Sequence, residues 1–559
     1  MRTVFCDRLR NTYNGQKFVF EFCTTNPNGA YTMRTVPGLI FLILAGSAPA
    51  EKNAVAACSP LPFSEVRRIL ATTESETLFP ELATLDKSVV RNDPRFSALS
   101  ESASAPQQTI PQTTYTLYRE FSRNGQREGY QKPYYDKRKQ LKAAVWAYWI
   151  LEDRSRLDFI NDLLWNICEE TTWVVPAHER GPDYIDLFSA ETASELAHIA
   201  YLLRNDLPNE ITQRIYREVK QRVLDPYLRL GRSYGWNSGR NNWTGVCAGS
   251  VGECFLLLEP DTDRVAAAVT LVLEQLDRFL QNGFEEDGGC LEGIGYWNYG
   301  LSHLVAFGEL LRVRTNNRID ILADPHLHAI AQYPLAVAIG EETYVSFSDS
   351  SERQRLHPFI LGKLSERTGI ANLRNLATAS DDWRFGSSLR DVLWGAPPTQ
   401  DAIELENAFL PVSGIVKLVA RPSDSPTVVL AAKAGHNNEP HNHNDVGSFI
   451  VSVGGIVYLC DPGAGRYSRD YFGPKRYENP FTSSYGHSVP RVAGEYQSPG
   501  EQFRGTMRKI SEYQYEIDMT RAYDMPLLEK LLRTLTLETS GTVILEDVFR
   551  FSQGNNEIE

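Results

Sequence analysis

The spacing of apolar residues changes once along this sequence, near Pro397. Before that point apolar residues recur three and four apart, as on one face of a helix. The clearest helical segments are residues 137–152, 156–169, 192–204, 210–228, 264–282 and 301–313. Beyond it, runs rich in β-branched and aromatic residues lie between turn residues, at 412–419, 427–432, 448–459, 513–518 and 542–549. The sequence therefore predicts a helical domain followed by an antiparallel β-sandwich.

Two large domains also agree with the length of 559 residues, which exceeds what one hydrophobic core usually supports. We expect residues 113–396 to form helix pairs in an α/α toroid, although no fixed-length repeat marks the pairs. Residues 397–559 should form the sandwich. Because the sequence ends soon after a predicted strand, we expect some closing strands to be missing from it.

The first 112 residues carry a predicted export signal. Met33 and Arg34 precede an apolar run at residues 37–46 and the small residues 48–50, which is typical of a signal peptide. This divides the region into an upstream extension (1–32), a signal peptide (33–50) and an N-terminal segment with a linker (51–112). The apolar run is too short to span a bilayer stably. We expect a secreted or periplasmic protein, with lipid anchoring at Cys58 as the less favoured alternative.

The net charge of −13 argues against a general nucleic-acid or anionic-membrane binder, because both need a basic surface. A local basic pocket remains compatible with this total. The eight cysteines form no close CxxC pair, so neither a zinc ribbon nor a dense disulfide scaffold is indicated.

Histidines and an acid are concentrated at residues 441–445 (HNHND). On an extended segment, side chains two residues apart point to the same face, so His441 and His443 could converge on one ligand or metal. Asp461 and His487 are further candidate ligands. The alternative is a polar loop whose histidines have no shared role.

Two motifs in the helical half are rich in aromatic and amide side chains. The first, residues 240–244 (RNNWT), opens a predicted helix, so an asparagine there could simply cap that helix. The second, residues 292–300 (EGIGYWNYG), is predicted to be a loop with three aromatic residues among three glycines. Either tyrosine could anchor the loop or present a phenol to a sugar.

Taken together and in this order, the three motifs resemble those of the heparinase II/III-like polysaccharide lyases. The resemblance covers about residues 115–559. It implies an incomplete α/α toroid joined to an antiparallel β-sandwich, with cleavage of a uronate-containing polysaccharide between the two domains. Related alginate lyases share this organisation, so glycosaminoglycans and alginate are both candidate substrates.

The resemblance also implies roles for single residues. To eliminate the 4-linked sugar, a lyase removes the C5 proton of the uronate and stabilises the adjacent carboxylate. Asn242 matches the carboxylate donor, Tyr296 the catalytic base, acid or both, and His441 a base for the other C5 epimer or a carboxylate contact. Further contacts with the anionic polysaccharide are expected from Asn241, Arg240, Trp243, Tyr299, Trp297 and Arg491, with Arg466, Lys475 and Arg476 as additional cations.

By the same resemblance, His443, Asp461 and His487 match the ligands of a structural zinc ion. Two neutral imidazoles and a carboxylate suit Zn²⁺, and a water molecule or another residue could complete a tetrahedron. The alternative is a hydrogen-bonded support beneath His441 that holds no metal.

Two other function classes remain open from the sequence. A glycoside hydrolase on an α/α toroid would need two positioned carboxylates, for which Glu285, Glu286, Asp287 and Glu292 are candidates. A noncatalytic polysaccharide-binding protein would keep an aromatic groove but would not need Tyr296 or His441.

Overall fold

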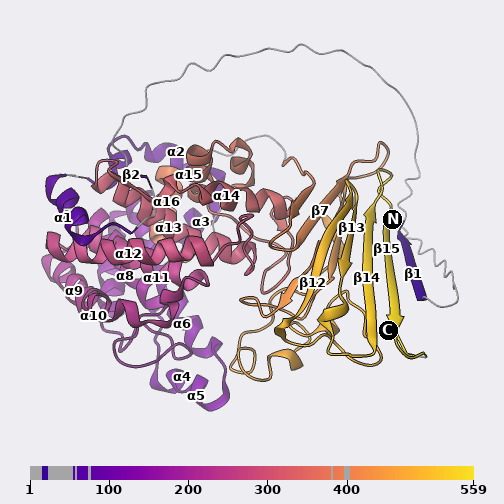
Figure 1. Ribbon diagram of the computed structural model, residues 1–559. Coiled ribbons are helices and arrows are strands. Elements are labelled where there is room, and N and C mark those ends of the chain that lie inside the picture. The colour runs from indigo at the N-terminus through magenta and orange to yellow at the C-terminus, as the bar shows by residue number, and fades with distance from the viewer. Residues whose placement is uncertain are drawn as a thin grey trace, which may run out of the picture.

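The computed structural model describes residues 60–73, 77–378, 382–395, 403–554 and 556–559, and also the strands β1 (Gln16–Phe22) and β2 (Val55–Ala56). Helices form one side of the molecule and antiparallel sheets the other, which confirms the predicted fold class (Figure 1). The predicted signal peptide and Cys58 lie outside the described residues. Within the predicted upstream extension, β1 pairs with the last strand of the chain.

The helical domain contains the segments with the predicted helical period, most of them extended by a few residues. Its helices are α1 (Phe63–Thr72), α2 (Lys87–Arg91), α3 (Ser97–Ser104), α4 (Tyr115–Tyr118), α5 (Glu120–Asn124), α6 (Glu128–Trp149), α7 (Leu157–Cys168), α8 (Leu187–Leu202), α9 (Asn209–Val219), α10 (Asp225–Leu230), α11 (Asn242–Leu258), α12 (Thr262–Asn282), α13 (Ile294–Arg314), α14 (His326–Val337), α15 (Pro358–Thr368) and α16 (Phe385–Trp394). The single helix predicted at 210–228 is divided by a π-helical turn, Lys220–Leu224, just before Pro226, which has no N–H to donate.

Close packing of α11 on α13 sets the geometry of the site. A Cβ at Gly245 would lie 2.8 Å from the carbonyl oxygen of Gly300, and one at Gly249 would lie 2.6 Å from that of His303. Only glycine therefore lets the two backbones come so close. From Gly245 to Gly249 along α11, the contacted residue of α13 moves from Gly300 to His303. The two helices therefore run parallel, and their N-termini lie side by side. This places Asn242, at the start of α11, beside the first turn of α13.

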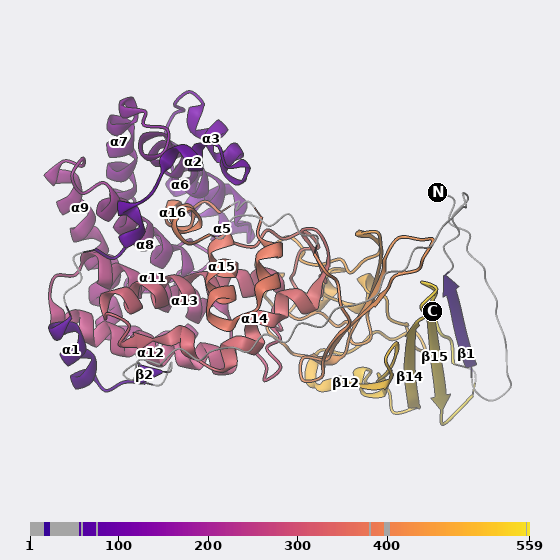
Figure 2. The same cartoon turned by 90° about the horizontal axis from the view of Figure 1, so that it is seen from above.

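The C-terminal domain is a sandwich of two antiparallel sheets (Figures 1 and 2). One sheet has the order β1-β15-β14-β13-β12-β9 and the other the order β11-β10-β8-β7-β6. Their bounds are β6 (Ala408–Leu410), β7 (Ile415–Ala420), β8 (Val428–Lys433), β9 (Gly435–Asn437), β10 (Phe449–Val453), β11 (Ile456–Leu459), β12 (Gly500–Ser511), β13 (Gln514–Asp518), β14 (Leu528–Leu537) and β15 (Val543–Phe551). Two-residue to three-residue strands β3 (Ile319–Asp320), β4 (Ala338–Gly340) and β5 (Thr343–Tyr344) lie in the helical half.

The single strand predicted at 448–459 is wrong. It is a hairpin of β10 and β11, because Gly454 and Gly455 have φ of 58° and 79° and reverse the chain between them. The long strand β12 was not predicted either. Most of its residues are exposed, so it lacks the clear alternation of apolar and polar residues that marks a half-buried strand.

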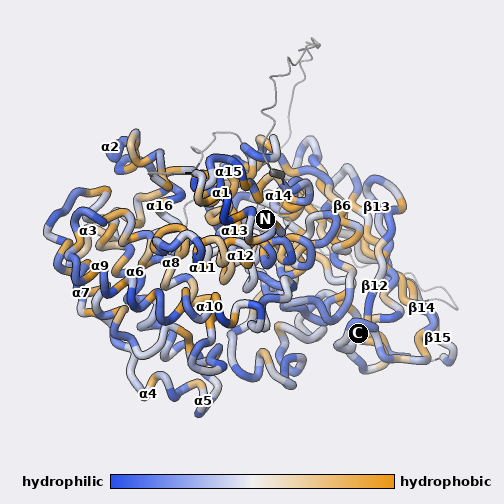
Figure 3. Tube along the Cα trace, turned by 60° about the vertical axis from the view of Figure 1, so that its left-hand side comes forward, coloured by the Kyte–Doolittle hydropathy of each residue, from blue (hydrophilic) through white to orange (hydrophobic). Residues whose placement is uncertain are grey.

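The five-stranded sheet is packed on both faces, so every residue of β7 and β8 is buried. Val416 and Leu418 pack into the sandwich core, whereas Ile415 and Val419 join the core of the helical domain. Apolar residues recur along the chain through both domains (Figure 3). The loop between β11 and β12, residues 460–499, also reaches back to the helices, where the Arg469 N–H donates to the Gly125 carbonyl at 3.1 Å. No helix in the described part of the chain is long and apolar enough to cross a membrane.

Candidate active site

Two adjoining cavities lie where the helical domain meets the loops of the sandwich. Cavity 1, of about 760 Å³, is bounded by residues 342–357 and 382–384. Cavity 2, of about 660 Å³, is bounded by residues 121–131, 177–188 and 467–472. Their common wall consists of aromatic residues of the helical domain, namely Tyr135, Phe188, Tyr296 and Tyr299.

The structure brings the three predicted catalytic residues together on the wall of cavity 2. Asn242, Tyr296 and His441 all line it, and Tyr296 lines cavity 1 as well. The rings of Tyr296 and His441 stack with centroids 4.4 Å apart, and the Tyr296 hydroxyl is 3.4 Å from Nδ1 of His441. A phenol and an imidazole, from different domains, therefore face the same space.

A second phenol supports Tyr296. Its hydroxyl oxygen is 2.5 Å from that of Tyr467, which lies on the loop between β11 and β12. Burial, reinforced by Tyr467, raises the pKa of Tyr296 well above its ordinary value. Tyr296 is therefore a protonated phenol at neutral pH. Sequence reasoning missed Tyr467, which belongs to none of the three motifs.

Asp349 links His441 to His443. Its Oδ2 is 2.7 Å from Nδ1 of His441, and its Oδ1 is 2.9 Å from Nε2 of His443. Burial opposes ionisation of this carboxyl, but the hydrogen bonds with the two histidines hold its pKa well below the usual range. An ionised carboxylate accepts an N–H from each ring, which fixes both tautomers and leaves Nε2 of neutral His441 without a proton.

The predicted geometry of residues 441–443 needs a correction. His441 has a left-handed backbone with φ of 57°, so the segment is not an extended strand. The two imidazoles still converge on one group, but that group is Asp349, which they reach from two sides. Asp349 was missed because it lies 92 residues before His441 and belongs to no local motif.

Glu292 holds Asn242 in place. Its two carboxylate oxygens accept from the backbone N–H of Asn242 at 2.7 Å and from Nδ2 at 2.6 Å. Burial raises the pKa of Glu292, and the positive charge that His441 carries when protonated and the hydrogen bonds from Asn242 oppose that rise. One amide hydrogen of Asn242 remains for a ligand, and its Oδ1 is buried without a partner in the described structure.

Two other predicted contacts, Trp243 and Tyr299, also line cavity 2. Asn241 is the N-cap of α11, because its Oδ1 accepts the backbone N–H of Trp243 at 3.2 Å. The capping alternative therefore describes Asn241, whereas Asn242 belongs to the cavity wall.

The other predicted contacts do not reach either cavity. The motif at 292–300 is mostly the first turns of α13, not a loop, so Trp297 is turned about 100° from Tyr296 and points into the core. Trp297 is fully buried, and its indole N–H donates to the Ile330 carbonyl at 2.9 Å. Arg240 is exposed, and Arg491 pairs with Glu559 at 3.0 Å. Of the additional cations, Arg466 pairs with Glu128, Arg476 donates to the Asn442 carbonyl, and Lys475 lines neither cavity.

The three predicted metal ligands form one buried group. Suitable ligand atoms of His443, Asp461 and His487 lie within 4.8 Å of one another. Nε2 of His443 is 2.9 Å from Asp349, and Nε2 of His487 is 3.1 Å from the Phe481 carbonyl. In each histidine, Nδ1 is therefore the atom available to a metal ion. Nδ1 of His443 is buried without a hydrogen-bond partner in the described structure. This donor set fits a zinc ion held through outer hydrogen bonds.

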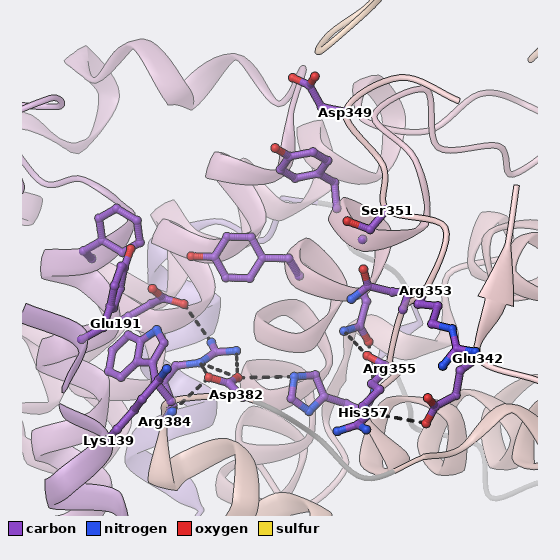
Figure 4. Close-up of a pocket in the computed structure, with 18 residues that line it drawn as sticks. Lys139, Glu191, Glu342, Asp349, Ser351, Arg353, Arg355, His357, Asp382 and Arg384 are labelled. Atoms are coloured by element: carbon purple, nitrogen blue, oxygen red, sulfur yellow. Dashed lines mark hydrogen bonds and ion pairs between the residues drawn. The ribbon is translucent and has the colours of Figure 1, made fainter. Parts of the chain in front are cut away.

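Cavity 1 has a wall of paired charges (Figure 4). Arg384 lies between Asp382 and Glu191, and Nη1 of Arg384 is 3.0 Å from Glu191. His357 lies 3.3 Å from Asp382. Because Asp382 shares the one guanidinium, burial dominates at Glu191 and raises its pKa to about 8. Sequence reasoning found none of this network, which joins residues almost 200 positions apart.

Comparisons with known proteins agree with the two-domain fold. Residues 404–555 match the family model described as heparinase II/III-like, C-terminal. The structure is similar to a crystal structure of heparinase III, with a TM-score of 0.62 and 14% identity over 88% of this chain and 75% of that one. A heparinase III with methylated lysines (TM-score 0.50, 13% identity, 88% and 77% covered) is also similar. So is a mutant heparan sulfate lyase HepC from Pedobacter heparinus (0.50, 13%, 88% and 74%). None of the curated proteins compared with the sequence matches it. At these identities, the likeness to solved structures shows the fold.

Proposed function

We propose that this chain, which is heparinase II/III-like in its fold and in its C-terminal domain, is a polysaccharide lyase that cleaves a uronate-containing polysaccharide by β-elimination. The observation that supports this most is the meeting of Tyr296, His441 and Asn242 on the wall of cavity 2. The first two are groups that move protons, and the third offers an amide N–H to a carboxylate.

His441 is the proposed base. Asp349 accepts a hydrogen bond from the Nδ1–H group of His441. Nε2 of His441 therefore carries the lone pair that can take the C5 proton of the uronate. As the C5–H bond breaks, negative charge moves onto the carboxylate of the sugar. The remaining amide hydrogen of Asn242, held in place by Glu292, can donate to that carboxylate.

Tyr296 is the proposed acid. The electrons left at C5 form the C4–C5 double bond and expel the 4-oxygen, which must gain a proton to leave as a hydroxyl. Burial and the hydrogen bond with Tyr467 keep the Tyr296 phenol protonated, so that it has a proton to give to the leaving oxygen. After turnover, Nε2 of His441 releases the C5 proton to water and the Tyr296 phenolate takes a proton from water, so both groups return to their starting states.

We also propose one structural Zn²⁺ held by His443, Asp461 and His487. When bound, the ion would supply a structural cross-link between the loop at 441–445 and the loop at 460–499, and no reacting group. The chain's own contribution is the hydrogen bond from His443 to Asp349, which orients the carboxylate that also holds His441.

The hydrolase alternative has less support from the structure. None of its four predicted carboxylates lines cavity 1 or cavity 2. Asp287 instead accepts the backbone N–H groups of Val412 and Ser413, and Glu292 accepts from Asn242. A noncatalytic binding protein would have no use for the His441–Asp349 pair. The predicted export signal suits an enzyme that meets its polysaccharide outside the cytoplasm.

The test is an incubation with a panel of uronate polymers, including heparan sulfate, hyaluronan and alginate. Elimination creates a C4–C5 double bond next to the carboxylate, so ultraviolet absorbance should rise with at least one polymer. Tyr296→Phe is the matched control and should not produce the rise. New reducing ends without ultraviolet absorbance would support a hydrolase, and no cleavage of any polymer would contradict the proposal.

A further inference from the structure

The two cavities differ in charge. The described residues that line cavity 2 include three arginines, Arg127, Arg180 and Arg469, and no aspartate or glutamate. Cavity 1 is lined by four basic and four acidic residues, namely Lys139, Arg353, Arg355, Arg384, Glu191, Glu342, Asp349 and Asp382. A cavity with only cationic charges in a chain of net charge −13 is suited to a negatively charged ligand.

Arg127, at the start of α6, is the most constrained of the three arginines. It is partly buried, and its Nε is buried with no hydrogen-bond partner in the described structure. Its guanidinium lies 5.0 Å from the ring centre of Phe472 and 5.8 Å from that of Phe121, and its Nη1 is 3.5 Å from His178. Burial lowers the pKa of Arg127, and the nearby phenols of Tyr467, Tyr135 and Tyr296 oppose this.

The fully buried arginines of the described chain have carboxylate partners, whereas Arg127 is partly buried. Arg138 pairs with Glu170 at 2.9 Å, Arg390 with Glu253 at 2.5 Å and Arg533 with Asp547 at 2.7 Å. Within the described residues, Arg127 has no carboxylate within ion-pair distance. A desolvated guanidinium without an anion is unfavourable, so an anion that enters the cavity would supply the missing partner.

Arg469 adds a second cation at the same place. Its guanidinium lies 5.2 Å from the ring centre of Phe121, so one phenyl ring contacts both arginines. Arg469 comes from the loop between β11 and β12, and it also donates to the Phe121 carbonyl. Two positive charges held on one ring repel each other, and an anion that contacts both would relieve that repulsion.

We propose that Arg127 and Arg469 form an anion subsite in cavity 2 that binds an oxyanion, either a carboxylate or a sulfate, of the polysaccharide. The two residues come from different domains, so the bound anion also ties the loop between β11 and β12 to the helical domain. That the anion belongs to a cleaved substrate rests on the proposed lyase function. Anion binding itself does not, and it can be measured without cleavage.

The experiment measures binding of two hexasaccharides of the same uronate–glucosamine backbone, one N-acetylated and unsulfated, the other sulfated. Full-length protein carrying Tyr296→Phe serves as the background, so that slow turnover does not consume the probes. Arg127→Gln removes the charge, and Arg127→Lys keeps the charge without the planar fork. Arg466→Gln is the matched control, because Arg466 lies on the same loop as Arg469, pairs with exposed Glu128 and lines neither cavity.

Arg127→Gln should weaken binding by about 10- to 100-fold, as expected for a charge-assisted hydrogen bond. Arg127→Lys should lose less, and Arg466→Gln should match the background. Binding by the background should weaken as salt is added, and this salt dependence should be smaller in Arg127→Gln. An equal loss with both probes assigns the anion as the carboxylate, and a loss with the sulfated probe alone assigns it as sulfate.

Unchanged affinity of Arg127→Gln for both probes would overturn the subsite. Loss of anion binding in a protein that cleaves no uronate polymer would keep the subsite and reject the lyase. If the unmodified protein shows elimination activity while Arg127→Gln binds the probes with normal affinity, the lyase proposal stands and the subsite is rejected. Circular dichroism and melting temperatures show whether each variant is folded, and Arg127→Lys provides the test if Arg127→Gln is not.

Discussion

Cavity 1 and cavity 2 share an aromatic wall but differ in how their charges are satisfied. In cavity 1, Arg384 lies between Asp382 and Glu191, so its partners are carboxyl groups of the protein itself. In cavity 2, Arg127 has no such partner in the described structure, and the groups able to move protons face the same space. Charges that pair with each other hold the wall of a cavity in place. A charged side chain without such a partner, beside groups that transfer protons, indicates where the substrate reacts.

The largest effect should come from one oxygen atom at the junction of the cavities. Tyr296→Phe keeps the ring stacked on His441 but removes the proposed acid, so turnover should fall by about 100-fold or more. Tyr299→Phe is the matched control, because that phenol faces Glu191 on the charged side, and it should change turnover much less. Initial rates on the best polymer would compare the two. Equal rates in both variants would remove Tyr296 from the chemistry.

A smaller loss is expected when the support of His441 is changed. Asn has one acceptor oxygen where ionised Asp349 has two, so Asp349→Asn cannot hold both His441 and His443 in their present tautomers. Turnover should fall by about 10- to 100-fold, with a changed pH profile of kcat/KM. A merely structural role would lower the melting temperature and leave that profile unchanged.

Metal removal should affect stability as well as rate. Zinc should copurify at about one ion per chain, the content expected of one structural site. Chelation should lower the Tm by several degrees, because a structural ion contributes to the free energy of folding. Elemental analysis and melting curves with and without chelator would measure both. A metal-free protein whose Tm does not respond to chelator would contradict the zinc proposal.

An effect on stability alone is expected in cavity 1. Burial raises the pKa of Glu191 from its ordinary 4.5 to about 8, so the folded protein binds this proton more tightly than the unfolded chain. Its contribution to stability is complete below pH 4.5 and is lost as pH rises through about 8. Glu191→Gln should remove that decline, on the order of a few kcal/mol between the two pH values. Urea unfolding at each pH would show it, and parallel pH profiles for both proteins would contradict it.

Local patterns in the sequence predict a good part of this molecule. The helix at 264–282 and the strands β7, β8, β13 and β15 follow from apolar spacing and residue type, and the three motifs supplied Asn242, Tyr296 and His441. Trp297 was placed wrongly because the motif was taken for a loop, where neighbouring side chains need not diverge. On a helix, adjacent residues are about 100° apart, so Tyr296 and Trp297 cannot face the same cavity.

The sequence could not predict contacts between residues that lie far apart along the chain. Asp349 and Tyr467 gain their importance only because the two domains pack together and bring them to His441 and Tyr296. The surroundings of Arg127 could not be predicted either. Any arginine in a polar stretch could be solvated, and only the packed structure shows that this one lies between aromatic rings without a carboxylate.

If cavity 2 breaks the polysaccharide by elimination, the masses of the products will distinguish this reaction from hydrolysis. An oligosaccharide of defined length, incubated with the enzyme in ¹⁸O-labelled water, should give two fragments whose masses sum to that of the substrate. Neither fragment should contain ¹⁸O, because elimination forms a C4–C5 double bond and adds no water. Fragments whose summed mass exceeds that of the substrate by one labelled water molecule would show hydrolysis and rule out elimination.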